Sequence, residues 1–485
     1  MNPGLVIGII AGYFALLVVV ARLTSKGATT STFFTANRQS PWYLVAFGMI
    51  GASLSGVTFI SVPGAVGAGA FSYFQVVLGY LLGYLVIARV LMPVYYKHNL
   101  VSIYHYLGNR FGLVSHKTGS LFFLISRTVQ ASFRLFLVAG VLQFALFESF
   151  GVPFWVSVII TIALIWVYTF QGGIKTIVWT DTLQTFFMLT AVVVTVILLM
   201  DTMGLTIGEA IREIKASDYS KTFYMDWSSP RFFVKQFVSG ALIAIVMTGL
   251  DQDMMQKNLT CKTLKDAQKN VFWFSTVLIP VNLLFLGLGA LLYLYASQNG
   301  LSLPAKADDL YPMIALNHLS IFAGVMFLLG IIAAAYSSAD SALTALTTAF
   351  CVDFLDFSKK EEAEKKRTRI KVHLGFSLIL FTVILIFRAI SDDSVINLLF
   401  RAAGYTYGPI LGLFAFGMLT KLQIKDRLVW VVCLVAPVLS FIIDMNTGGW
   451  FGFFILALNG VLTFLGLLLI STSQKAENPA EITTT

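Results

Sequence analysis

Residues 331–354 have the sequence IIAAAYSSADSALTALTTAFCVDF. Most of it is apolar enough to lie in a bilayer, yet small and hydroxylated residues recur at the spacing of one helix face. The members of this stripe are Ala334, Ser337, Ser338, Ser341, Ala345 and Thr348. Asp340 lies beside it, and an unpaired carboxylate at mid-membrane costs about 2.5–3.5 kcal/mol. Because hard cations prefer oxygen ligands, the stretch predicts a membrane helix that carries a sodium site.

The composition agrees with a membrane location. The chain has 485 residues, of which 57% are hydrophobic and 12% are charged. Segments of about 20 apolar residues each can cross a bilayer as a helix. They predict an all-α membrane protein with about 13 transmembrane helices, near residues 4–23, 43–69, 71–96, 116–146, 152–170, 177–200, 232–256, 269–297, 319–355, 372–390, 396–420, 427–444 and 449–471.

The net charge of +9 does not point to nucleic acid, because the basic residues gather in alternate loops. This asymmetry places those loops in the cytoplasm. It predicts an inner-membrane protein with its N-terminus outside and its C-terminus inside. The loop residues are Arg22, Lys26 and Arg38, then Lys97 and Arg110, then Lys257, Lys262 and Lys265, then the run KKEEAEKKRTRIK at 359–371, and last Lys421, Lys425 and Arg427.

The local structure of three further segments can be predicted from their composition. The run at 359–371 is expected to be a solvated connector. Residues 205–227 are expected to form a short surface helix, and the polar tail after Ser471, which ends AENPAEITTT, is expected to be disordered. Three unpaired cysteines indicate neither a disulfide framework nor a zinc site.

Several function classes lack their sequence signatures. The chain has no GxxxxGK[ST], HExxH or CxxC motif, so an ATP-driven pump or another membrane enzyme is not predicted. Secondary transport remains, with a channel or a sensor without coupled transport as the alternative.

The second apolar span is unusually rich in glycine. Its sequence, FGMIGASLSGVTFISVPGAVGAGAF at 47–71, also contains Pro63. Such a span is a candidate for a helix that is broken in mid-membrane, where freed carbonyls can bind a cation. The alternative is a close-packed interface of small residues.

Four motifs, in their order and spacing, carry a family resemblance. They are GGIKTIVWTDTLQ at 172–184, GLDQDMMQKNL at 249–259, AAAYSSADSALTALTTAFCVDF at 333–354 and GYTYGPILGLF at 404–414. With the broken second span, they resemble the sodium/solute symporter family. The resemblance implies a LeuT-type core of two inverted five-helix repeats, although no internal repeat is visible in the sequence. The implied divisions are 1–41 for the first helix and its loop, 42–200 and 201–421 for the repeats, 422–471 for two extra helices, and 472–485 for the tail.

The resemblance also implies the cation sites, for one or two Na⁺. One sodium would bind the carbonyls of Gly51, Leu54 and Ala334 and the hydroxyls of Ser337 and Ser338. A second would use Asp181 with Ser337, Asp340 and Ser341, although Asp340 replaces a serine that is common there. Alternatives remain open. Asp181 could complement a helix dipole, and Asp340 could pair with Arg127 or Arg134, or could titrate and make the step proton-sensitive.

The solute is expected to bind beside the broken span. That span offers the hydroxyls of Ser53, Ser55 and Thr58, and Arg127 and Arg134 lie on one face of another helix. Guanidinium groups bind carboxylates, so a carboxylate-bearing solute such as sialic acid is predicted. A structural role for the arginines, and a neutral sugar or amino acid as solute, are the alternatives. Further pocket or gate candidates are Phe74, Gln75, Phe237, Tyr405 and Tyr407. The expected partners are a small organic solute and the lipid bilayer, and the chain is expected to be a monomer.

Overall fold

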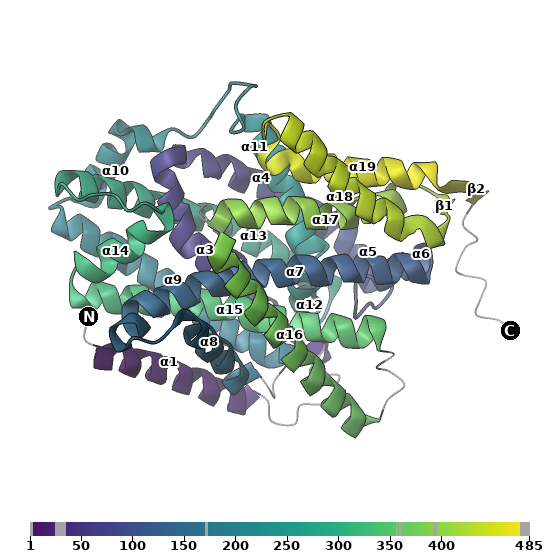
Figure 1. Ribbon diagram of the computed structural model, residues 1–485, viewed down its shortest axis with the longest axis horizontal. Coiled ribbons are helices and arrows are strands. Elements are labelled where there is room, and N and C mark those ends of the chain that lie inside the picture. Colours follow the sequence, from purple (N-terminus) through teal and green to yellow (C-terminus); the bar gives the residue numbers. More distant parts are fainter. Residues whose placement is uncertain are drawn as a thin grey trace.

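The computed structural model describes residues 3–24, 35–169, 173–355, 357, 361–390 and 395–475. The expectations for Lys26, for the start of the charged run at Lys359 and Lys360, and for the segment 476–485 lie outside this part of the chain. The described chain is almost entirely helical, and its long helices pack into a multi-pass membrane protein (Figure 1).

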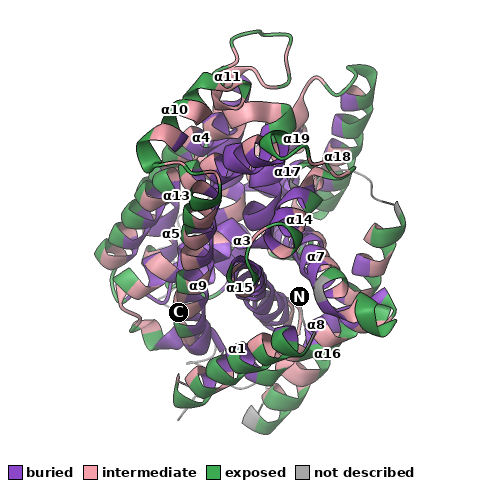
Figure 2. Cartoon of the chain, turned by 90° about the vertical axis from the view of Figure 1, so that its left-hand side faces the viewer, coloured by how far each residue is buried: buried purple, intermediate pink, exposed green. Residues whose placement is uncertain are grey.

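The first half contains α1 (Pro3–Thr24), α3 (Trp42–Gly69), α4 (Tyr73–Val86), α5 (Met92–Lys97), α6 (His105–Arg110), α7 (Leu113–Leu142), α8 (Phe154–Thr169) and α9 (Gly173–Thr202). The second half contains α10 (Ile207–Ala216), α11 (Phe233–Ala244), α12 (Gln252–Asn258), α13 (Leu264–Gln298), α14 (Leu310–Asn317), α15 (Ile321–Phe354), α16 (Glu362–Ile390), α17 (Val395–Leu419), α18 (Val429–Asn446) and α19 (Ile455–Leu469). Helices α3, α9 and α15 pack against one another. Figure 2 shows α3 and α15 among the most buried parts of the chain, whereas α1, α16 and α18 lie at the periphery.

Ten helices in the described residues are long and apolar enough to cross a membrane, or eleven when the bent pair Phe233–Gly249 and Gln252–Asn258 counts as one span. The number of about 13 is therefore not confirmed. One reason is that Trp42–Lys97 forms a single helical stretch of 56 residues in this count. Another is that Phe154–Tyr168 is apolar but short.

The glycine-rich span is broken, as predicted. Ser55 has φ 53 and ψ 175 inside α3, so the helix is interrupted there, while Pro63 lies within its second, continuous part. The same span is also closely packed. A Cβ on Gly51 would lie 2.2 Å from Thr185 Oγ1 of α9, and one on Gly48 would lie 3.0 Å from the Cβ of Asp181. The two interpretations of the glycines are therefore compatible.

A second broken span was not predicted. Between α11 and α12 the chain bends by 71°. The side chain of Asp251 then accepts a hydrogen bond from the backbone N–H of Met254 and caps α12. The sequence has no proline and no paired glycine here. The acidic residues of GLDQDMM are the only local feature that could have predicted the break.

The three segments with a predicted local structure are a surface helix, a charged connector and a polar tail. The surface helix in 205–227 is present as α10, which begins with a capping box between Thr206 and Glu209. The charged run is only partly a connector, because α16 already begins at Glu362. The tail assignment was wrong at its start, since β2 (Ser471–Lys475) pairs antiparallel with β1 (Leu422–Ile424).

Candidate solute and cation site

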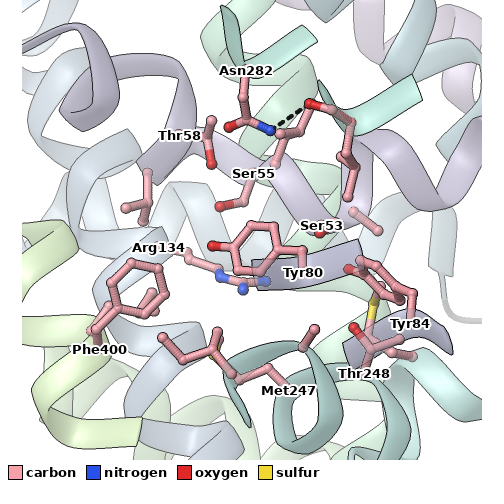
Figure 3. Close-up of a pocket in the computed structure, with 18 of the residues that line it drawn as sticks. Ser53, Ser55, Thr58, Tyr80, Tyr84, Arg134, Met247, Thr248, Asn282 and Phe400 are labelled. Atoms are coloured by element: carbon pink, nitrogen blue, oxygen red, sulfur yellow. Dashed lines mark hydrogen bonds between the residues drawn. The ribbon is translucent and has the colours of Figure 1, made fainter. Parts of the chain in front are cut away.

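A central cavity lies at the break of α3. Its polar lining includes the predicted hydroxyls of Ser53, Ser55 and Thr58 and the two arginines of α7. Figure 3 shows Ser55 and Thr58 of α3 and Arg134 of α7 around the same space. The sequence-based reasoning missed several other lining residues, namely Tyr73, Tyr80, Tyr84, Met247, Thr248, Asn282 and Phe400. Nothing in their local sequence marked them, because each is an ordinary residue of an apolar span.

The two arginines of α7 have different surroundings. Arg127 is 2% exposed and its Nη2 donates to Asp253 Oδ2, while its Nη1 lies 3.9 Å from Asp251 Oδ2. Arg134 is 5% exposed, and its Nε and Nη1 have no hydrogen-bond partner in the described part of the chain. The charge of Arg127 is thus compensated by direct contacts, whereas Arg134 faces the cavity and forms no ion pair with a carboxylate of the described residues, although Asp253 and Asp251 attract it from a longer distance.

The partners of Arg127 form a buried network between α7, α12, α15 and α17. The hydroxyl of Tyr407 donates to Asp251, and Ser341 Oγ donates to Asp253 Oδ2 at 3.2 Å. Buried charges that are paired and hydrogen-bonded in this way are the ones a protein interior tolerates. Asp251 and Asp253 were quoted in a family motif, but the sequence could not assign them to Arg127.

Three predicted solute residues lie outside the central cavity. Gln75 holds the loop before α11: its Nε2 donates to Arg231 O at 3.1 Å, and its Oε1 accepts from Tyr224 N at 3.2 Å. Phe237 packs against Phe233, with ring centroids 5.7 Å apart. Tyr405 points to α18, where its hydroxyl donates to Asp444 Oδ2 at 3.0 Å. The structure does not bring these side chains to the hydroxyls of α3.

The polar stripe of α15 meets the break of α3. Ser338 Oγ donates to Ala52 O at 3.2 Å and lies 3.4 Å from Ala334 O. Ala52 lies between Gly51 and Leu54, the two residues of α3 whose carbonyls were predicted as sodium ligands. Carbonyl and hydroxyl oxygens therefore converge where two helices touch. This donor set suits a hard monovalent cation, because every group supplies oxygen.

Ser337 faces a different partner. Its Oγ donates to Asp181 Oδ1 of α9 at 2.7 Å. The other carboxylate oxygen of Asp181 lies 2.7 Å from Lys257 Nζ of α12. Both side chains of this ion pair are 1% exposed. The ammonium of Lys257 thus occupies one side of the predicted second cation site.

This ion pair corrects the sequence-based placement of Lys257, which was counted with the cytoplasmic loop. The charge density of 249–265 suggested a loop, but α12 is turned inward by the break before it. Lys257 is therefore enclosed by α9 and α12 and does not contribute to the positive loops.

Asp340 pairs with neither Arg127 nor Arg134. Its Oδ1 accepts from the backbone N–H of Ser341 at 2.5 Å. Its Oδ2 is buried without a hydrogen-bond partner among the described residues. Ser341 Oγ in turn donates to Asp253 Oδ2, so this hydroxyl is bonded to a different carboxylate from that of Asp181.

Residues 33–424 match the profile of the Sodium:solute symporter family. A sodium/sialic acid symporter of Proteus mirabilis is 23% identical over 424 residues, which cover 85% of this chain and 84% of that protein. A sodium/glucose cotransporter of Vibrio parahaemolyticus is 26% identical over 373 residues, covering 71% and 67%.

Among solved structures, a substrate-bound outward-open Na⁺-coupled sialic acid symporter superposes with a TM-score of 0.81. It is 20% identical and is covered to 99%, with 97% of this chain matched. This chain therefore shares with that symporter a helical fold of the LeuT type, along nearly its whole length. Since the family profile spans most of the sequence, the chain belongs to the sodium:solute symporter family, whose members are sodium-coupled transporters.

Proposed function

We propose that the protein imports a small carboxylate-bearing solute together with sodium. The observation that carries this proposal is the guanidinium of Arg134, which is buried at the cavity, has two nitrogens without a hydrogen-bond partner and forms no ion pair among the described residues. A buried charge without a partner is costly, so a site that retains one is suited to an anionic ligand. The hydroxyls of Ser55 and Thr58 lie at the same cavity and can bind the remaining polar groups of the solute.

The relatives differ in solute, and the arginine favours one class. The Proteus protein carries sialic acid, which is a carboxylate, whereas the Vibrio protein carries glucose, which is neutral. A second cavity shares Tyr73 with the central one and is lined by Arg231, Lys306 and Arg401. Basic residues on this approach would raise the local concentration of an anion. A neutral sugar or amino acid remains the second candidate, on the strength of the hydroxyls of α3.

The two ends of the cavity suggest the gates of an alternating-access cycle. Toward the second cavity, the ring of Tyr73 stacks on Phe400 at 6.3 Å. At the opposite end, Arg127 is tied to Asp253 of α12. We infer that solute enters past Tyr73 and Phe400 and leaves when the Arg127 network opens.

One sodium per cycle fits the contacts best. Its proposed ligands are the carbonyls of Gly51, Leu54 and Ala334 and the hydroxyls of Ser337 and Ser338. At the second site, the ammonium of Lys257 already supplies a positive charge to Asp181. The ammonium of Lys257 would thus take the place of a second sodium ion at Asp181. Asp340 and Ser341 would then lie beside this site without binding an ion.

The proposed topology has thirteen crossings. The ten qualifying helices become eleven when Trp42–Lys97 is divided at Ala70, which has a positive φ of 47. The bent pair of α11 and α12 and the short helix α8 supply two more. The start of α1 and strand β2 lie at opposite ends of the molecule in Figure 1, as an odd number of crossings requires. We place the N-terminus outside and the C-terminus in the cytoplasm of a bacterial inner membrane, and we propose a monomer with the repeat boundaries 42–200 and 201–421.

The function is tested by the thermal stability of the purified protein in Na⁺ and in K⁺, with sialic acid, simpler carboxylates, neutral sugars and amino acids. A ligand that binds only the folded state raises Tm by mass action. We expect Na⁺ to raise Tm, and a carboxylate to raise it further only when Na⁺ is present. Stabilisation by a neutral sugar instead would overturn the assigned solute class.

The sodium site gives a direct prediction. Ser337→Ala combined with Ser338→Ala removes two hydroxyl ligands, so the sodium concentration for half-maximal transport should rise by roughly 10-fold, equivalent to about 1.4 kcal/mol. Thr347→Ala is a matched control, because Thr347 lies on the same helix but bonds to Leu343 O and His373. An unchanged sodium dependence in the double variant would rule out this site.

Asp340 has its own test. Asp340→Ser restores the residue expected from the resemblance and removes a buried carboxylate whose Oδ2 has no partner in the described chain. If the carboxylate takes part in coupling, the substitution should change the pH profile of transport or the Hill coefficient for sodium. If both stay as in the parent, Asp340 has only a structural role.

A further inference from the structure

A second polar cluster lies far from the central cavity, where α6, α7 and α15 meet. It contains His105, the first residue of α6, His116 in the first turns of α7, and Asp353 near the end of α15. One ligand atom from each side chain lies within 4.8 Å of the other two. Figure 1 shows α6 beside one end of α7, and Asp353 of α15 joins them although it lies 237 residues after His116.

The carboxylate of Asp353 is held in a fixed orientation. Its Oδ2 accepts hydrogen bonds from Ser102 Oγ at 3.0 Å and from Ser120 Oγ at 2.6 Å. This leaves Oδ1 facing the two imidazoles, with His116 Nε2 at 3.0 Å and His105 Nδ1 at 3.9 Å. Hydrogen bonds that orient a ligating carboxylate in this way are the usual second shell of a metal site.

The geometry points to a binding site for a divalent transition metal of the Zn²⁺ or Co²⁺ type, with His105 Nδ1, His116 Nε2 and Asp353 Oδ1 as ligands. In a tetrahedral zinc site with bonds of 2.0–2.2 Å, neighbouring ligand atoms are about 3.4 Å apart. The two separations of 3.0 and 3.9 Å bracket this value. The two imidazole nitrogens lie within 4.8 Å of each other, so the rings would rotate toward one another when a metal closes the site.

The cluster also has an entrance. The side chain of His105 is 43% exposed, whereas that of Asp353 is fully buried. A metal can thus arrive from solvent at His105, and a water or another small ligand can take the fourth position. Two imidazoles and one carboxylate are ligands that suit zinc and cobalt better than sodium or magnesium.

A bound metal would fasten the segment 101–105 to the rest of the protein. On one side this segment bonds to the broken span, because Gln252 Nε2 donates to Val101 O at 2.7 Å and Ile103 N donates to Gln252 Oε1 at 2.9 Å. On the other side, Ser102 and His105 contact Asp353. The metal would therefore link α12 to the ends of α7 and α15. Helix α12 also contributes Met254 to the lining of the solute cavity.

The test uses the full-length protein, purified without a histidine tag and titrated with Zn²⁺ by calorimetry. The parent should bind one Zn²⁺ in this cluster, and Co²⁺ should show the visible absorption of a tetrahedral complex. His105→Asn and His116→Asn should each weaken binding by more than about 100-fold, because even outer-shell partners are worth about 10–100-fold. His105→Cys should retain binding, since a thiolate is also a zinc ligand.

The control variants are His98→Asn and His318→Asn, which remove exposed histidines elsewhere. Equal melting temperatures without metal would show that the cluster variants are folded. Hydrogen exchange gives a second readout: Zn²⁺ should slow exchange of the amides at 101–107 in the parent but not in His105→Asn. Absence of Zn²⁺ binding, or equal affinity in the parent and His105→Asn, would overturn the site and leave a cluster joined by hydrogen bonds alone.

Discussion

Arg134→Gln is expected to abolish solute-dependent stabilisation while leaving the fold intact. A guanidinium that binds a carboxylate makes charged hydrogen bonds worth about 1.5–3 kcal/mol each. Loss of two of them should raise the half-saturating solute concentration by roughly 100-fold or more. Tm without solute should be unchanged or higher, because the substitution removes a buried charge that has no acidic partner in the described chain.

Three variants make this prediction specific. Arg134→Lys keeps the charge but loses the planar fork, so an intermediate affinity is expected. Arg127→Gln should lower stability by about 3–5 kcal/mol, because it strands Asp253 and Asp251 in the interior. Arg388→Gln removes an exposed arginine that packs over Phe154 and should leave transport as in the parent. Unaltered solute affinity in Arg134→Gln would contradict the assignment of this arginine to the solute.

The second large effect is expected from Lys257→Gln, which should destabilise the protein in K⁺ by about 3–5 kcal/mol. The substitution leaves Asp181 buried without its ammonium partner. Sodium should then bind the freed carboxylate and recover part of the stability, so Tm should depend more steeply on Na⁺ than in the parent. For the same reason, the Hill coefficient for sodium in transport should rise from about one toward two.

Two controls separate this effect from simple loss of a buried lysine. Lys235→Gln removes another buried lysine, whose ammonium lies 3.3 Å from the ring centroid of Trp450, and should add no sodium dependence. Lys257→Gln combined with Asp181→Asn replaces both charges and should recover most of the stability without sodium. If Lys257→Gln has the Tm and Hill coefficient of the parent at every sodium concentration, Lys257 does not stand in for a cation.

Much of the site could be predicted from the sequence because its signals are local. The hydroxyl stripe of Ser337, Ser338 and Ser341 follows helix periodicity, and it lies on one long helix in the structure. The break in the glycine-rich span was predicted within the residues where Ser55 interrupts α3. The break before α12 was missed, since its cap at Asp251 looks like any acidic residue before a loop.

The sequence alone determined the class of this protein: apolar spans long enough for a bilayer, a broken helix and a polar helix face, each written within some 30 residues. It could not distinguish Arg127 from Arg134, which are seven residues apart on one face. These roles are visible in the folded chain, where Arg127 pairs with Asp253 and Lys257 with Asp181, while Arg134 faces the cavity. The physical reason is that a buried charge is stabilised by whichever opposite charge the folded helices bring within a few ångströms, and these partners lie 126 residues apart for Arg127 and Asp253.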